Sequence, residues 1–126
     1  MAGERILVVD DNPANLRLLR LLLAAESYEV RTADAAEEAM AVLRDFRPHL
    51  ILMDLQMPGV NGFDLTRRLK GDPATRDIVI VALTAYAMKG DEERAREAGC
   101  DGYVAKPIDT RTLPTVIAGH LAEAAK

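Results

Sequence analysis

The sequence predicts an α/β protein built on a five-stranded parallel sheet that is doubly wound, with five helices packed on its two faces. Three observations lead to this prediction: strand and helix patterns alternate strictly, several strands are apolar throughout, and polar residues follow the strands directly. Strands of a parallel sheet are buried on both faces and therefore read as continuous apolar runs. A length of 126 residues with 49% hydrophobic content suits one core, so we expect a single domain over 1–126.

The first half of the chain contains three strand and helix pairs. Asn12 and Pro13 predict a helix cap followed by proline at the first helical position. Asp34 with Glu37 resembles a capping box for the second helix. The expected strands span 5–9, 29–33 and 49–53, and the third helix is expected around 63–70. The residues expected to face the sheet from the first two helices are Leu16, Leu19, Leu23, Ala36, Ala39, Met40 and Leu43.

The second half contains two more pairs. Strands are expected over 78–83 and 103–105, with a charged helix over 91–98 between them. Pro114 fits a helix only in its first turn, so the last helix should begin near residue 112. Its inward face is expected to contain Leu113, Val116, Ile117 and Leu121.

Composition excludes several classes of function. The net charge is −4 and no basic run is present, which argues against binding to nucleic acid or to an anionic membrane surface. No apolar run approaches the length of a membrane span. Cys100, the only cysteine, is expected to be a small packing residue rather than a redox sensor. Nothing in the first residues suggests export, so we expect a cytoplasmic protein.

Polar side chains at the strand ends form the main functional signal. The carboxyl ends of parallel strands meet at one edge of the sheet, which should gather Asp10, Asp11, Asp54, Thr84 and Lys106. Clustered carboxylates repel one another unless a cation lies between them, and an all-oxygen ligand set favours Mg²⁺. An acidic residue after a strand is also a common helix cap, and for Asp10 and Asp11 alone the two readings carry equal weight. The hydroxyl of Thr84 and the ammonium group of Lys106 at the same edge of the sheet favour phosphoryl chemistry.

Four motifs in order carry a family resemblance: Val8-Val9-Asp10-Asp11-Asn12, Leu52-Met53-Asp54-Leu55-Gln56-Met57-Pro58-Gly59, Ala82-Leu83-Thr84-Ala85 and Tyr103-Val104-Ala105-Lys106-Pro107. With them the whole chain resembles the CheY-like receiver domains of two-component response regulators. The resemblance implies a flavodoxin-like fold with strand order 2-1-3-4-5. It also implies a signalling protein rather than an enzyme with a separate substrate.

The resemblance assigns a role to each strand-end residue. Asp54 would accept a phosphoryl group from a phosphohistidine, with Mg²⁺ held by Asp10, Asp11, Asp54 and the backbone carbonyl of Gln56. Lys106 and Thr84 would bind phosphoryl oxygens.

Two further positions complete the implied set. Thr84 would move toward the phosphoryl group and Tyr103 would turn inward behind it, although Tyr103 alone also reads as a half-buried packing residue. The Lys106-Pro107 bond would be cis.

The expected partners are proteins. A histidine kinase or phosphotransfer protein would donate the phosphoryl group and a downstream protein would read it, with donor specificity in exposed residues such as Asn15, Arg17 and Leu18. We expect a stand-alone receiver without an output domain; a receiver from a hybrid kinase or a longer regulator is the alternative. Two other classes fit less well. A phosphatase with an aspartyl-phosphate intermediate would place its nucleophile in an Asp-x-Asp after the first strand, and a phosphorylation-independent binding module would lack a motif residue.

Overall fold

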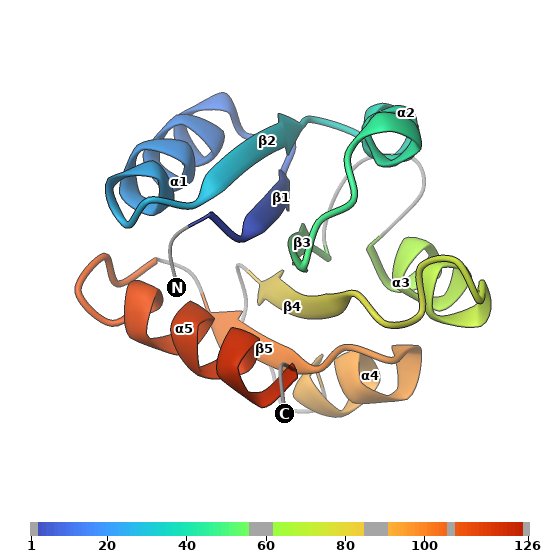
Figure 1. Cartoon of the computed structure of the whole chain (residues 1–126). Coiled ribbons are helices and arrows are strands. Elements are labelled where there is room, and N and C mark those ends of the chain that lie inside the picture. The colour runs from blue at the N-terminus through green and yellow to red at the C-terminus, as the bar shows by residue number, and fades with distance from the viewer. Residues whose placement is uncertain (1–2, 56–61, 85–90, 106–107, 125–126) are drawn as a thin grey trace.

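A computed structural model describes residues 3–55, 62–84, 91–105 and 108–124 of the chain. Figure 1 shows strands and helices in alternation, with the strands forming one central sheet. The strands are β1 (Arg5–Val9), β2 (Glu29–Ala33), β3 (Leu50–Asp54), β4 (Val79–Thr84) and β5 (Gly102–Ala105). The helices are α1 (Pro13–Ala25), α2 (Ala36–Asp45), α3 (Gly62–Gly71), α4 (Asp91–Ala98) and α5 (Leu113–Ala124).

The sheet is parallel throughout and has the order β2-β1-β3-β4-β5, as the resemblance implied. The central strands β3 and β4 are buried at every position, because helices cover both of their faces. Within the described residues, no helix is both long enough and apolar enough to cross a membrane.

Two apolar clusters lie on opposite faces of the sheet. Leucines of α1 and α5 pack on one face, around Val8, Leu52 and Leu83. Residues of α2, α3 and α4 pack on the other face, around Ile51 and Met53. Figure 1 shows the same division, with α1 and α5 on one side of the strands and α2, α3 and α4 on the other. Every central strand therefore contributes alternate side chains to two separate cores.

Most predicted boundaries agree with the structure, and two strands begin and end one residue later than expected. Asn12 caps α1 with its side chain, accepting from the backbone N–H of Ala14 at 2.9 Å. The predicted third and fourth strands stopped before a polar residue, whereas β3 and β4 include Asp54 and Thr84. Backbone pairing continues through both positions, since Asp54 pairs with Leu83 in the ladder. A polar side chain at the edge of a sheet does not interrupt the main-chain hydrogen bonds.

Two local predictions were wrong. The cap of α2 is Ala35 rather than Asp34, and no side chain caps it. Glu38, not Glu37, reaches back toward the chain and accepts the N–H of Asp34 at 3.0 Å. In a capping box the side chain that reaches back comes from the third residue after the cap, so a cap at Ala35 selects Glu38 where a cap at Asp34 would have selected Glu37.

The second error concerns the inward face of α5. Val116 was expected there, but its side chain is 36% exposed. Leu113, Ile117 and Leu121 form a single buried row four residues apart. A buried row of this kind is a narrow apolar stripe, and Val116 lies outside it.

Candidate functional site

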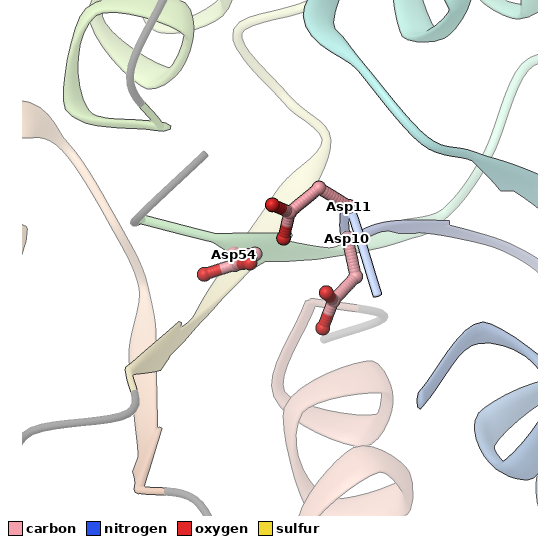
Figure 2. A group of neighbouring side chains, drawn as sticks. All are labelled: Asp10, Asp11 and Asp54. Carbon is pink, nitrogen blue, oxygen red and sulfur yellow. The ribbon is translucent and has the colours of Figure 1, made fainter. Parts of the chain in front are cut away.

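Three carboxylates meet where β1 and β3 end (Figure 2). Asp10 and Asp11 follow β1 directly and Asp54 is the last residue of β3, as the sequence predicted. One oxygen from each carboxylate lies within 4.8 Å of the others. Asp10 and Asp54 are buried while Asp11 is exposed, so the cluster opens to solvent on the side of Asp11.

The loop that leads into α1 orients the Asp10 carboxylate. The backbone N–H of Asn12 donates to Oδ1 of Asp10 at 2.9 Å, and the side-chain amide of Asn15 donates to Oδ2 at 3.4 Å. Asn12 thus caps the helix with its side chain and holds Asp10 with its backbone. Asn15 was expected on an exposed docking surface, but it is half-buried against Asp10.

Thr84 lies beside the strand that carries Asp54. The N–H of Leu55 donates to the carbonyl of Leu83 at 3.0 Å, so the main chains are still paired beyond Asp54. Thr84 is the next residue along β4 and is buried. It pairs in the ladder with Ala105, the last residue of β5. The hydroxyl-bearing residue therefore belongs to the same sheet edge as the carboxylates.

Tyr103 lies in β5 and is half-buried. It packs against the apolar cluster shared by α2, α3 and α4. This position agrees with both readings of the residue, a packing tyrosine and a side chain that turns inward on phosphorylation. Gln56, Lys106 and Pro107 lie outside the described residues, so their expected roles and the cis bond stay predictions.

Gly62, the first residue of α3, supports the site and was not among the predicted site residues. A Cβ at this position would lie 2.7 Å from Cα of Leu55 and nearer still to the backbone oxygen of Asp54. The helix can therefore begin against the end of β3 only because residue 62 has no side chain. The sequence showed a glycine in a turn-rich segment, and such a glycine does not by itself reveal which backbone approaches it.

Thr66 is a second supporting residue that sequence reasoning missed. It is fully buried in α3, and its hydroxyl donates to the carbonyl of Gly62 at 2.7 Å. The thiol of Cys100 donates to Oγ1 of Thr66 at 3.9 Å from the other side. Cys100 is buried in the core, as predicted, and burial is the main cause that raises the pKa of its thiol.

The chemistry of the donor set suits a divalent cation. All the potential ligand atoms of the cluster are carboxylate oxygens, and two of the three side chains are buried. Small hard cations prefer oxygen ligands, and Mg²⁺ is commonly bound by one or two carboxylates together with phosphate oxygens and water. Asp10, Asp11 and Asp54 therefore fit a site for a divalent cation.

Comparison with known proteins gives one consistent result. The model of the "Response regulator receiver domain" family matches residues 6–118. The chain is 43% identical over 121 residues to the polar-differentiation response regulator DivK of Brucella anthropi, covering 96% of this chain and 98% of that one. Among solved structures, a CheY-like receiver domain protein of Methanospirillum hungatei superposes with a TM-score of 0.90 at 30% identity, covering 98% of each chain. The receiver domain of a histidine kinase from Syntrophus aciditrophicus superposes with a TM-score of 0.87 at 31% identity, covering 96% of this chain and 92% of that one.

Proposed function

The chain belongs to the response regulator receiver domain family, and we propose that Asp54 is the residue on which it is phosphorylated. The observation that carries this proposal is the meeting of Asp10, Asp11 and Asp54 within 4.8 Å at one edge of the sheet. As a receiver, the protein is a signalling protein of a two-component system.

The proposed reaction is a phosphoryl transfer to a carboxylate. An oxygen of Asp54 forms a bond to phosphorus while the bond between phosphorus and the imidazole nitrogen of a phosphohistidine breaks. The imidazole leaves with the electron pair of that bond and later takes a proton from water. The product is an acyl phosphate on Asp54, which water can hydrolyse to return the carboxylate. The chain would contribute to both steps itself, which distinguishes it from a passive substrate of the kinase.

Asp10 and Asp11 would hold Mg²⁺ together with Asp54, and the backbone carbonyl of Gln56 would complete the protein ligands. Bound Mg²⁺ supplies positive charge that offsets the charge on the phosphoryl oxygens. Asp10 is already oriented for this role by the N–H of Asn12 and the amide of Asn15. Those two donors fix the carboxylate before any cation binds, which lowers the entropy cost of forming the site.

The response to phosphorylation would start at Thr84. A phosphoryl group brings roughly 1.5 to 2 negative charges at neutral pH, and the hydroxyl of Thr84 and the ammonium of Lys106 would each bind one of its oxygens. Both contacts exist only in the phosphorylated state, so they favour a conformation in which β4 has shifted toward Asp54. Tyr103, half-buried in the strand that pairs with Thr84, would then fill the space behind it.

The exposed face of α1 is the proposed docking site for the phosphodonor protein. Leu18 and Leu21 are 41% and 62% exposed, an unusual position for large apolar side chains. Arg17 is exposed beside them and forms no ion pair within the described part of the chain. An apolar pair flanked by a free cation suits a helix with an apolar stripe and acidic residues, as a kinase or phosphotransfer protein could present. We propose that the transfer of the phosphoryl group from the donor protein takes place in the cytoplasm.

Phosphorylation by a small donor tests the assignment of Asp54 without a kinase. The purified protein should gain one phosphoryl group from acetyl phosphate in the presence of Mg²⁺, measured by intact mass, and should gain none when Mg²⁺ is chelated. Asp54→Ala should remain unlabelled. Asp34→Ala is the matched control, because Asp34 also follows a strand directly but is exposed and lies outside the carboxylate cluster. Labelling of Asp54→Ala at the wild-type level would refute the assignment.

A further inference from the structure

Within the described residues, helix α4 buries few apolar side chains. Among its described side chains, only Ala95 and Ala98 are buried. An alanine buries little apolar surface, so these two residues alone contribute a weak hydrophobic attachment. The described part of the chain surrounds α4 with β5 and with α3, its helical neighbour on this face of the sheet, so contacts with α3 help to place α4.

One of these contacts joins Arg94 of α4 to Phe63 of α3. The guanidinium carbon of Arg94 lies 4.5 Å from the centre of the Phe63 ring. This distance is well within the range of a cation–π interaction, and the Phe63 side chain is largely buried, which strengthens the attraction. Arg94 thus covers the ring with a charged group that remains partly in contact with solvent.

Phe63 belongs to the turn of helix that rests on the strand of Asp54. Its neighbour Gly62 donates its N–H to the carbonyl of Leu55 at 3.3 Å. The close approach of Gly62 to the backbone of Asp54 and Leu55 leaves no space between this turn and the end of β3. A displacement of the β3 end by a phosphoryl group would therefore move the first turn of α3 with it.

A second contact joins the same turn to the segment that follows α4. The hydroxyl of Thr66 donates a hydrogen bond to the carbonyl of Gly62 and accepts one from the thiol of Cys100. Cys100 in turn donates its N–H to the carbonyl of Ala95 at 2.9 Å, which closes the end of α4. The first turn of α3 is therefore in contact with the Asp54 strand on one side and with α4 on the other.

We propose that Arg94 is a positioning residue that couples the placement of α4 to the phosphorylation state of Asp54 through Phe63 and the first turn of α3. The inference rests on the proposed function, because it requires that Asp54 is the phosphorylated residue. It adds a second route, through β3 and α3, to the one through Thr84 in β4 and Tyr103 in β5. Coupling of this kind is reciprocal, so a partner that fixes α4 in one position would also change the stability of the phosphorylated form.

The chain offers a matched control for the test. Arg31 lies over the ring of Phe46 at 5.0 Å, which is the same kind of contact, but it joins β2 to the C-cap residue of α2 instead of joining α4 to α3. Wild type, Arg94→Gln and Arg31→Gln would be treated with acetyl phosphate and Mg²⁺. Intact mass gives the phosphorylated fraction, and the backbone amide chemical shifts of residues 93–98 report on α4.

We expect all three proteins to reach the same phosphorylated fraction. In Arg94→Gln the phosphorylation-dependent shift changes of the α4 amides should fall to about half of the wild-type values or less, while Arg31→Gln keeps them. Arg94→Lys retains the charge above the ring and should keep most of the response. Loss of the response in Arg94→Lys to the same extent as in Arg94→Gln would refute the role of the cation.

Two further outcomes separate this inference from the function on which it rests. A full α4 response in Arg94→Gln, at equal phosphorylated fraction, would overturn the coupling and leave Asp54 as the acceptor. Absence of phosphorylation in the wild type, or labelling that survives in Asp54→Ala, would overturn the proposed function and the inference together.

Discussion

Substituting Gly62 with alanine should destabilise the protein and disturb its acceptor residue. The new methyl group would lie 2.7 Å from Cα of Leu55, where ordinary contacts between carbon atoms are about 3.5 to 4 Å. The atoms that it meets belong to the backbone of Asp54 and Leu55, which cannot rotate away as a side chain can. Either α3 or the end of β3 must move by about 1 Å, and overpacking of this kind costs roughly 1–3 kcal/mol.

The same substitution at Gly119 should have the opposite sign. Gly119 lies within α5, and a Cβ there would have no neighbour within 4 Å. Alanine in a helix interior is favoured over glycine by about 0.5–1 kcal/mol, so Gly119→Ala should stabilise the protein by that amount. Urea unfolding followed by circular dichroism measures both changes in the free energy of unfolding.

The functional readout separates strain at the site from a general loss of stability. Gly62→Ala displaces the backbone of Asp54, so labelling by acetyl phosphate should slow markedly at temperatures where the variant is still folded. Gly119→Ala should be labelled at the wild-type rate. A Gly62→Ala protein as stable as the wild type, with Asp54 labelled at the normal rate, would refute the claim that this glycine is required by close backbone contact.

Two further predictions concern pH and docking. Burial raises the pKa of the Tyr28 phenol, as do the charges of Glu4 and Glu26, and burial raises the pKa of the Cys100 thiol. Both groups ionise more readily in the unfolded chain, so the free energy of unfolding should decline as pH rises above the ordinary thiol pKa of 9.0. Cys100→Ala or Tyr28→Phe should make this decline less steep, as measured by urea unfolding at a series of pH values. A wild-type free energy of unfolding that stays constant above this pH would contradict the prediction. Leu21→Asp should slow transfer from a protein phosphodonor about tenfold and leave labelling by acetyl phosphate unchanged, whereas equal slowing of both reactions would place Leu21 outside the docking face.

The fold could be predicted because its determinants are local and repeated. Continuous apolar runs identify β3 and β4, and a capping residue followed by proline, here Asn12 and Pro13, identifies where a helix begins. When strands and helices alternate along the chain, the right-handedness of the crossover connections allows only a few topologies for the parallel sheet. The carboxylate cluster follows from the same logic, because residues at the carboxyl ends of parallel strands lie at one edge of the sheet.

The supporting residues could not be predicted in this way. The contact of Gly62 with the strand of Asp54 depends on where a helix begins in space, and the bond from Thr66 to Gly62 depends on that start as well. Asn15 shows the same limit, since its spacing along α1 suits an exposed position, whereas its amide turns toward Asp10. Such contacts are set by tertiary packing, which overrides the pattern of a single helix.

The two apolar clusters on opposite faces of the sheet allow the surfaces of this protein to evolve separately. The α1 face lies over the cluster around Val8 and Leu52, whereas α3 and α4 lie over the cluster around Ile51 and Met53. Substitutions at distant sites without shared neighbours usually have additive effects. After a gene duplication, one copy could therefore acquire a new donor through changes on α1 while its α4 surface, and with it the recipient of the signal, stays as it was.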